Sequence, residues 1–457
     1  MKIALIFPRL KHENFGDPPL GLAYLAAYLK RVSNFKVSIL DMAFLSAAEV
    51  RGRLIKERPD MAGVYFSTPA YNIAIEAARA AKEAGCFVAA GGPHATVFPQ
   101  SLEEEVDAIV IGEGEAAFAE LALAYAAGNN PEAIGGIWFR DNGRTVKNAP
   151  REPLLDLDIL PYPERGLLEM ERYIDNCQYF DCVDIKIRAA TMISSRGCPF
   201  KCAYCQPTLN KLFGRNIRLR SPENIIAEIE ELRSGYAVDA VYLHDDTLTF
   251  DRKWVEDLCR KLIIRVPGLI WGCNSRADLL DEGLLGLMRE SGLSCLHIGA
   301  ESASQRIIDE IYAKGIKLLD VRQAVAMAKR KNIRTMCFFM LGAPTETRRE
   351  IENTISFARG LDLDEAVFNI ASPMPGTLLY ETAKSLGYHI SDRWEDFNYY
   401  SQKAYNNSGL GGRQVKYLQL KALFMFYLSL YRLKYVLRHF YSLRGLRKLL
   451  RKIKRFF

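Results

Sequence analysis

Three cysteines lie close together between Ser195 and Gln206, where the chain reads Ser-Arg-Gly-Cys-Pro-Phe-Lys-Cys-Ala-Tyr-Cys-Gln. Cys198 and Cys202 are separated by three residues, and Cys202 and Cys205 by two. A loop of this length can fold its thiolates around one cube of iron and sulfide, for which thiolate is the usual protein ligand. Because a four-iron cluster needs four ligands, the spacing predicts a cluster with one iron left for a ligand from outside the chain.

A zinc site is the alternative for closely spaced cysteines. Structural zinc takes four ligands, usually as two separated pairs, whereas this stretch offers a single run of three thiols. Gly197 and Pro199 favour a tight turn over a helix. The sequence therefore favours the cluster, with Cys198, Cys202 and Cys205 as its metal ligands and as catalytic residues.

The cysteine run resembles the cluster motif of the radical S-adenosylmethionine (SAM) enzymes. The resemblance implies a [4Fe-4S] cluster whose open iron is chelated by the amino and carboxylate groups of SAM. In that family, one electron from the cluster splits the sulfonium of SAM and yields a 5′-deoxyadenosyl radical. An electron donor such as a flavodoxin or a ferredoxin is then expected as a partner.

Length and charge limit the remaining interpretations. The 457 residues predict two or three domains. The chain contains ten cysteines, and its first residues read as a strand and not as a signal peptide, which together indicate a cytoplasmic location. The charge is uneven, because thirteen Lys or Arg and no acidic residue follow Gly412 in a chain of net charge +7. The part before the tail is therefore acidic, and no nucleic acid is expected as a partner.

Short apolar runs alternate with helical patterns in the first third of the chain, which predicts a doubly wound parallel sheet of the flavodoxin type. Such sheets bind ligands beyond the carboxyl ends of their strands. The residues at those ends are Pro19, Leu20, Gly21, Ser67, Gly91, Gly92, Pro93, Gly112, Glu113 and Gly114. Glycine at such a place lets a bulky ligand approach the backbone closely.

In order, and ahead of the cysteine run, these loops resemble the cobalamin-binding domain of the cobalamin-dependent radical SAM enzymes over residues 1–135. The resemblance implies cobalamin as a further cofactor, bound by those loop residues. The Asp-x-His-x-x-Gly motif that supplies the lower cobalt ligand in mutases is absent. His94 follows Gly92-Pro93 and is either a cobalt ligand or a loop histidine with local hydrogen bonds.

Residues 136–183 read as a linker that contains a hairpin, since Asp141-Asn142-Gly143 separates two short apolar runs and four prolines follow. Six apolar strands then alternate with helical sequence in a core domain over residues 184–412. This pattern predicts a partial (β/α)6 barrel of the TIM type, with its chemistry at the carboxyl ends of the strands. The expected strands are 191–194, 240–243, 270–273, 295–298, 336–340 and 367–370.

The radical SAM resemblance assigns SAM contacts to polar residues that follow these strands. Asp245 and Asp246 are expected near the SAM amino group, because a carboxylate suits an ammonium. Arg276 is expected to face the SAM carboxylate. The ribose or the methionyl part is expected at Glu301 and Ser302, and the adenine at Gly342.

Residues 413–457 read as a basic amphipathic helical tail, because apolar residues from Val436 to Phe457 recur every three or four positions and basic residues fill the other faces. Such a helix can lie on an anionic membrane surface, at the inner face of the cell membrane. The alternatives are a helix packed on the body and, less favoured, an RNA-binding segment.

The two resemblances together imply an enzyme that methylates an unactivated carbon of a hydrophobic or natural-product-like small molecule, which could be lipid-like. A cyclase, a carbon–carbon coupling enzyme or an oxidase with the same cofactors is the alternative. A methylthiotransferase would need three further cysteines in the front domain, where Cys86 alone is present. A non-catalytic binding protein for cobalamin or lipid is a fourth interpretation, which the intact cysteine run disfavours.

Overall fold

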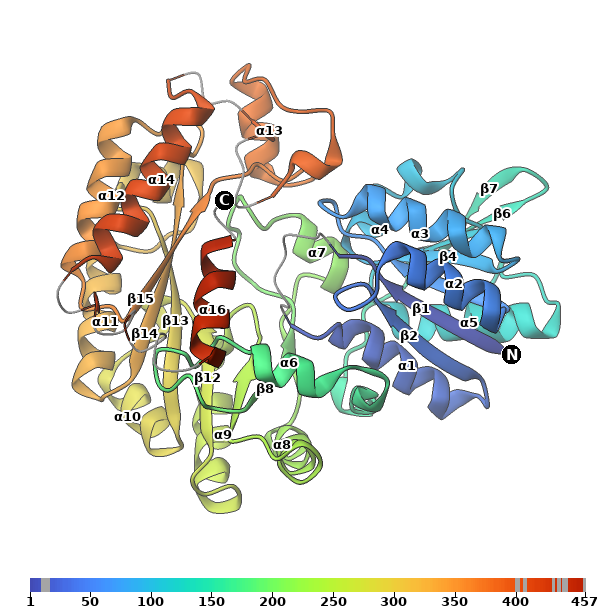
Figure 1. Ribbon diagram of the computed structural model, residues 1–457, viewed down its shortest axis with the longest axis horizontal. Helices are drawn as coiled ribbons and strands as arrows, with labels where there is room; N and C mark the ends of the chain where they lie inside the picture. The colour runs from blue at the N-terminus through green and yellow to red at the C-terminus, as the bar shows by residue number, and fades with distance from the viewer. Residues whose placement is uncertain are drawn as a thin grey trace. The chain divides into compact units, whose positions relative to one another are not determined.

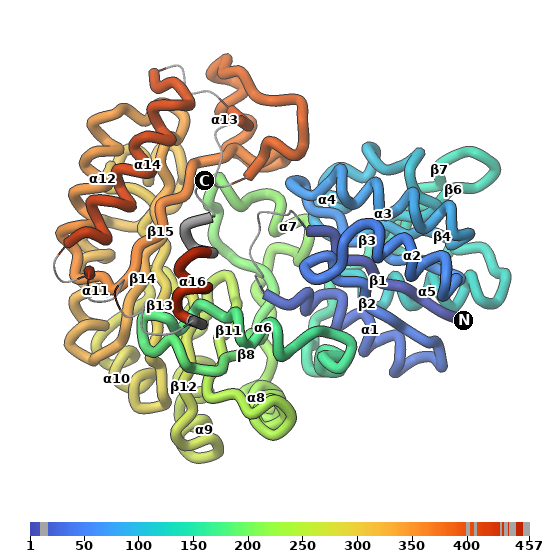
Figure 2. The backbone as a smooth tube through the Cα atoms, viewed as in Figure 1, coloured from blue at the N-terminus to red at the C-terminus, as the bar shows by residue number. Residues whose placement is uncertain are grey.

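The computed structural model describes residues 1–9, 17–398, 403–405, 409–429, 432, 433, 437 and 443–454. These residues belong to two compact units. Unit 1 comprises Met1–Met170 and Pro207–Arg218, and unit 2 comprises Glu171–Gln206 and Leu219–Phe457. Figure 1 shows the elements of each unit, and Figure 2 traces the same backbone. The segment that directly follows the cysteine run thus belongs to unit 1.

Unit 1 is built on a seven-stranded sheet of order β2-β1-β3-β4-β5-β6-β7. Strands β1 to β5 pair in parallel, which confirms the predicted doubly wound sheet. Its strands are β1 Lys2–Phe7, β2 Lys36–Asp41, β3 Met61–Tyr65, β4 Phe87–Gly91, β5 Ala108–Val110, β6 Ile137–Asp141 and β7 Arg144–Lys147. Its helices are α1 Leu20–Val32, α2 Ala47–Glu57, α3 Tyr71–Glu83, α4 Pro93–Val97, α5 Gly114–Ala127 and α7 Thr208–Phe213.

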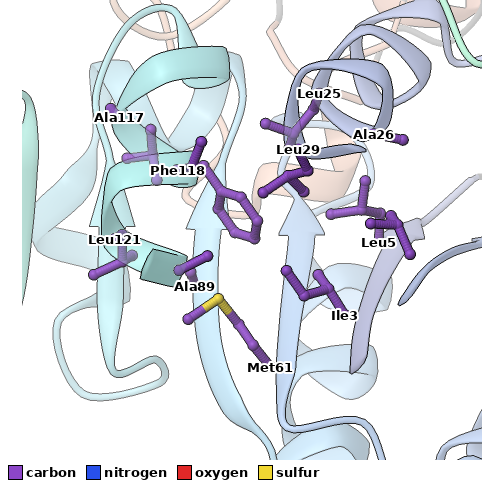
Figure 3. Close-up of a cluster of buried hydrophobic side chains, with 14 of the residues drawn as sticks. Ile3, Leu5, Leu25, Ala26, Leu29, Met61, Ala89, Ala117, Phe118 and Leu121 are labelled. Carbon is purple, nitrogen blue, oxygen red and sulfur yellow. The ribbon is translucent and has the colours of Figure 1, made fainter. Parts of the chain in front are cut away.

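Both faces of the front sheet are buried, as a parallel sheet requires. Helices α1 and α5 cover one face, where Leu29 and Phe118 pack over Ile3, Leu5 and Met61 (Figure 3). Helices α2 and α3 cover the other face through a second apolar cluster. A side chain at Gly63 of β3 would meet Leu5 and Phe118, so this glycine makes room for the aromatic ring.

The predicted hairpin forms the edge of the front sheet. Strands β6 and β7 are joined by Asn142 and Gly143, both with positive φ (46° and 82°), as a two-residue turn between antiparallel strands requires. Strand β6 also pairs with β5, with Trp138 opposite Ile109. The hairpin is thus part of the sheet and not of a linker, since β6 pairs with β5, and periodicity alone does not show which strand edge needs a partner.

Unit 2 contains a six-stranded, fully parallel sheet of order β15-β14-β13-β12-β11-β8, the predicted partial barrel. Its strands are β8 Ala189–Met192, β11 Ala240–Leu243, β12 Ile270–Ser275, β13 Leu293–Glu301, β14 Arg334–Leu341 and β15 Glu365–Ile370. Two short strands, β9 Ser195–Arg196 and β10 Arg218–Leu219, pair separately. The helices are α6 Met170–Asn176, α8 Pro222–Tyr236, α9 Arg252–Arg265, α10 Glu282–Glu290, α11 Leu318–Arg330, α12 Arg348–Gly360, α13 Leu378–Ser385, α14 Gly412–Tyr427 and α16 Leu443–Lys454.

Strand β15 is an edge strand, and side chains from the C-terminal segment bond its backbone. Gln419 of α14 donates to the carbonyl of Phe368 (2.8 Å), and the Tyr427 hydroxyl donates to that of Ala366 (3.1 Å). Arg432 donates to the carbonyls of Leu361 and Leu363, just ahead of the strand. Helix α14 is thus packed on the body of unit 2, whereas the interpretations given above for the tail concern the later stretch from Val436.

Helix α16 is attached to unit 2 through one buried cation. Lys448 is 2% exposed and donates to Asp181 (2.7 Å) and to the carbonyls of Cys177 and Ile185. Leu450 on the same helix is 50% exposed. Val436, Phe440 and Phe457, which belong to the predicted apolar face, lie outside the described residues. Within the described ranges, no helix has the length and apolar character needed to cross a membrane.

Candidate functional site

The cysteine run leaves β9 as an irregular loop that other parts of unit 2 hold in place. The backbone N–H of Ala203 donates to Tyr312 (2.8 Å), and the Ala203 carbonyl accepts from Leu379 at the start of α13 (2.9 Å). The Gln206 amide donates to the carbonyls of Cys198 and Phe200, so it ties the end of the loop to its beginning. The loop is therefore held by backbone hydrogen bonds and by the side-chain amide of Gln206.

The surroundings of the loop thiols bear on what these thiols could hold. Among the residues that the structure describes, no three His, Cys, Asp or Glu side chains are grouped to hold one metal ion. The thiols nevertheless share one environment, because burial and then the charge of Cys202 raise the pKa of Cys205. Burial likewise raises the pKa of Cys198. Thiolates that are costly to bury together are those that a positively charged iron core would stabilise.

Arg276 follows β12 and faces the cluster loop. Its guanidinium lies over the Phe200 ring (3.7 Å from guanidinium carbon to ring centroid), and Nη1 lies 3.9 Å from the Cys202 sulfur. Asp278 accepts from both Nε and Nη2, which fixes the orientation of the guanidinium. The residue predicted to face the SAM carboxylate thus supplies a buried positive charge beside a cluster ligand.

Glu301 ends β13 in an unusual backbone conformation. The register with β14 shifts between Gly299 and Glu301, so the strand bulges there, and Glu301 has a φ of 63°. A bulge at a strand end re-aims the side chain, and left-handed backbone at a residue other than glycine is characteristic of functional sites. The Glu301 carboxylate accepts from Lys314 (2.5 Å) and from Tyr204 of the cluster loop (3.2 Å).

Three neighbours of Glu301 were not predicted from the sequence. Lys314 is buried, and Tyr204 lies between two of the cluster cysteines. A side chain on Gly299 would overlap both the Glu301 carboxylate and the Lys314 ammonium, so the pair needs a glycine there. The sequence motif Gly-Ala-Glu-Ser contains this glycine, but nothing in the local pattern indicates Lys314, thirteen residues after Glu301.

The two aspartates after β11 differ in their surroundings. Asp245 is buried and accepts from the backbone N–H and the hydroxyl of both Ser194 and Ser195, at 2.5–2.9 Å. Asp245 thus bonds the entry to the cluster loop, and its predicted contact with the SAM amino group stays a prediction. Asp246 is exposed as a residue, but burial of its carboxyl, followed by the Asp245 charge, raises the pKa of that carboxyl. It remains the predicted partner of the SAM amino group.

Ser302 and Gly342 are joined by Glu346, a carboxyl that the sequence analysis missed. The Ser302 hydroxyl lies 3.5 Å from Glu346, and the backbone N–H of Gly342 donates to the same side chain (2.6 Å). Burial raises the pKa of Glu346 to about 7. Gly342 has a φ of 85°, which a glycine tolerates. Ser302 is fully buried, so its part here is to hold the loops that follow β13 and β14 together.

The loop after β4 in unit 1 contains a glycine that the fold requires. Gly92 has a φ of 99°, and a Cβ there would meet the Phe66 carbonyl and the Tyr65 ring at 2.9 Å. Gly91 ends β4, and Pro93 is the first residue of α4, as its fixed φ allows. Ser67 lies opposite in the loop after β3, half-buried.

His94 is a buried loop residue with local hydrogen bonds. Its Nδ1 lies 3.0 Å from the Thr68 hydroxyl and its Nε2 lies 3.0 Å from the Ser101 hydroxyl. Burial lowers its pKa to about 4. Because both ring nitrogens are bonded within unit 1, neither is presented as a cobalt ligand, and the second interpretation of His94 fits the structure.

The buried imidazole makes a pH dependence of stability predictable. Folded His94 stays neutral down to a pKa of about 4, whereas unfolded His94 takes up a proton below its ordinary pKa near 6.5. Stability is therefore full above pH 6.5 and is lost as the pH falls toward 4, by about 2 kcal/mol at pH 5. Denaturant unfolding at pH 7 and pH 5 measures this loss. A His94→Gln variant should show a smaller loss, and a variant of exposed His389, His389→Gln, should behave like the wild type.

The loop after β5 contains residues that are already bonded within unit 1. Gly112 has a φ of 78°, and its N–H donates to the Thr96 hydroxyl (3.0 Å). Glu113, a predicted cobalamin contact, instead forms a buried ion pair with Arg218 (2.8 Å) and accepts from the Leu154 N–H. Glu113 therefore holds the segment after the cysteine run within unit 1. Gly114 begins α5.

The first strand leads to the start of α1. Pro19 is the residue before the helix, and its carbonyl accepts from the Ala23 N–H (3.1 Å). Leu20 is buried and Gly21 is exposed, with open space around its Cα. Gly21 and this helix start leave room at the carboxyl edge of the sheet, which fits a large, flat cofactor.

The fold and these sites define a class of protein, an enzyme that combines a doubly wound ligand-binding unit with a partial barrel around an iron–sulfur loop. Family models described as "B12 binding domain" and "Radical SAM superfamily" match residues 17–122 and 192–358. The chain is 34% identical over 411 residues to the uncharacterized methyltransferase PH0819 of Pyrococcus horikoshii, covering 87% of this chain and 86% of that protein. It belongs to the cobalamin-dependent radical SAM enzymes.

Other relatives agree with this assignment. The anaerobic magnesium-protoporphyrin IX monomethyl ester cyclase of Rubrivivax gelatinosus is 32% identical over 395 residues, which cover 84% of this chain and 68% of the cyclase. The solved structure of the radical SAM methyltransferase TsrM from Kitasatospora setae has a TM-score of 0.69 at 17% identity, covering 84% of this chain and 75% of TsrM. The solved structure of the radical SAM enzyme OxsB has a TM-score of 0.73 at 16% identity, and the match covers 100% of this chain and 72% of OxsB. The family cofactors are therefore a [4Fe-4S] cluster, SAM and cobalamin, and the substrate is a small molecule.

Proposed function

We propose that this chain is a methyltransferase that attaches a methyl group to an unactivated carbon of a hydrophobic or natural-product-like small molecule. The observation that carries the proposal is the 34% identity, along most of both chains, to a protein named a methyltransferase. A hopanoid C-2 methylase, 24% identical over 383 residues, supports an apolar substrate. When bound, the three cofactors supply a hydrogen-abstracting radical and a transferable methyl group.

The described side chains support an assignment of roles in unit 2. We assign Cys198, Cys202 and Cys205 to the cluster and Asp246 to the SAM amino group. The buried Lys314 ammonium, which is paired with Glu301, is a second candidate beside Arg276 to meet the SAM carboxylate. In unit 1 we assign the loops of Gly91, Gly92 and Gly112, at the carboxyl edge of the sheet, to cobalamin.

A cyclase that uses the same cofactors is the second candidate. The 32% identity to the anaerobic magnesium-protoporphyrin IX monomethyl ester cyclase of Rubrivivax gelatinosus favours it. The two candidates differ in the fate of the SAM methyl group, because a cyclase leaves that group out of the product. A measurement of the products of SAM separates them.

We predict that turnover of the reconstituted protein yields 5′-deoxyadenosine and S-adenosylhomocysteine in equal amounts, with a labelled SAM methyl group in the product. The substrate is supplied as an extract of cells that lack the gene. It is identified there as a metabolite that is one methyl group lighter than its counterpart in wild-type cells. Deoxyadenosine without S-adenosylhomocysteine would favour the cyclase. Cys205→Ala should give neither product, and Cys337→Ser, which changes a buried cysteine of β14, should resemble the wild type.

We also propose a cytoplasmic location and electron transfer from a flavodoxin or ferredoxin. All ten cysteines are free thiols, which suits a reducing compartment. A peripheral contact of the basic tail with the inner face of the membrane remains a proposal from the sequence. Cosedimentation with anionic vesicles, with and without residues 443–457, tests it while leaving α14 and its bonds to β15 intact.

A further inference from the structure

Two thiols and an imidazole lie together in unit 2, away from the residues assigned above. The Cys182 and Cys295 sulfurs are 3.4 Å apart, and the Cys295 sulfur is 3.2 Å from His297 Nε2. All three side chains are buried, at 4%, 0% and 2% exposure. Cys295 precedes Glu301 by six residues on β13, which separates their backbones by roughly 20 Å.

The hydrogen bonds around His297 determine which of its nitrogens is basic. The Asn274 amide donates to the Asp245 carbonyl (3.0 Å), so its oxygen is turned toward Tyr242 and accepts the hydroxyl hydrogen (2.8 Å). The Tyr242 oxygen then accepts from His297 Nδ1 (2.6 Å). A neutral imidazole carries one N–H, so Nε2 is left as a base that faces the Cys295 thiol.

A thiol beside a base, with the base oriented by a third group, is the arrangement of an activated nucleophile. A hydrogen bond from the Cys182 thiol and, against the effect of burial, the charge of His297 lower the pKa of Cys295. Cys182 in turn has its pKa raised, so it is the thiol that stays protonated. The pair therefore consists of one reactive sulfur and one neighbouring thiol that can attack it after oxidation.

We propose that Cys295 and Cys182 form an oxidisable dithiol whose oxidant is a hydroperoxide. Cys295 passes its proton to His297 Nε2, and its sulfur attacks one peroxide oxygen. The S–O bond forms as the O–O bond breaks, and the leaving oxygen takes that proton from His297, as water when the oxidant is hydrogen peroxide. The Cys182 sulfur then attacks the oxidised sulfur, an S–S bond forms, and the second oxygen leaves as water with the Cys182 proton. The two thiols lose two electrons and the peroxide gains them. Closing the bond requires the sulfurs to approach by roughly 1.4 Å.

Such a bond would be transient, as intracellular disulfides usually are. Its chemistry is independent of methyl transfer, because none of the residues involved belongs to the cluster or to the proposed SAM contacts. The segment that carries Cys182 also contains Cys177, Asp181 and Ile185, which Lys448 holds. Oxidation would join this segment covalently to β13.

The test treats the full-length reconstituted protein with hydrogen peroxide, blocks free thiols, and maps disulfides by mass spectrometry of an unreduced digest. The expected result is a Cys182–Cys295 bond. Cys182→Ser should instead leave a sulfenic acid on Cys295, trapped by dimedone. His297→Gln and Tyr242→Phe should each slow the reaction at least tenfold, and Cys337→Ser should leave it unchanged.

Two results would overturn the proposal. One is the absence of the Cys182–Cys295 bond at a peroxide dose that already oxidises the cluster cysteines. Oxidation of those cysteines is read from the same digest. The other is a wild-type rate of oxidation in both His297→Gln and Tyr242→Phe. Measured iron content separates either result from a loss of the cluster.

Discussion

Replacing Gly299 with alanine is expected to weaken SAM cleavage by about 100-fold, although the residue contacts no cofactor in the proposed site. The new Cβ would overlap the Glu301 carboxylate and the Lys314 ammonium. Both groups are buried and paired with each other, so one must move and the ion pair must separate or shift. Overpacking of this kind costs about 1–3 kcal/mol of stability, which leaves the protein folded.

The measurement compares SAM affinity and the rate of deoxyadenosine formation in Gly299→Ala and in Gly235→Ala. Gly235 lies in α8 and has open space around its Cα, so its variant should match the wild type in both quantities and gain slightly in stability. Iron content is measured in both variants, because Glu301 accepts from Tyr204 of the cluster loop and a loss of SAM cleavage must be separated from a loss of the cluster. Wild-type SAM affinity in Gly299→Ala would show that the Glu301–Lys314 pair does not bind SAM.

Replacing Asp245 with alanine is expected to destabilise unit 2 by about 3–5 kcal/mol and to prevent full loading of the cluster. The change leaves two backbone N–H groups and two hydroxyls, from Ser194 and Ser195, without their acceptor. The wild-type site is itself under tension, since burial raises the pKa of Asp245 while these hydrogen bonds oppose the shift.

Asp245→Asn is the matched control. Its amide oxygen can still accept from the two N–H groups, and it removes the buried charge, so a loss of about 1 kcal/mol is expected. Denaturant unfolding and iron content after anaerobic reconstitution measure both effects. If Asp245→Ala binds a full complement of iron at wild-type stability, Asp245 does not position the cluster loop.

The elements of both units were predictable because apolar periodicity and length are local properties. The five parallel strands of unit 1 form the predicted doubly wound sheet, and the six strands of unit 2 overlap the ranges that the apolar runs predicted. Strand β8 is an informative difference. It ends at Met192, two residues before the predicted end, because Ser194 and Ser195 direct their N–H groups to Asp245.

The partners of individual side chains were not predictable in this way. Arg276, Asp245 and Glu113 follow strands, where polar residues often meet a ligand, yet each is engaged by a residue distant in the sequence. The sequence contains no signal for such pairings, since they depend on the register of neighbouring strands and on the path of loops. Lys314 was missed for the converse reason, because it lies on no strand and in no motif.

The half-closed sheet of unit 2 has a consequence for how the chain can be shortened. A closed barrel has no free strand edge, whereas β15 has one. Side chains of Gln419 and Tyr427 bond carbonyl groups of β15, and Arg432 bonds a carbonyl just ahead of it, on the edge where a closed barrel would have a further strand. Removing them would uncover a ready template for pairing with another copy of the chain. Deletion from Gly412 onward should therefore lead to self-association and aggregation of the chain. The C-terminal segment protects the open edge of the partial barrel.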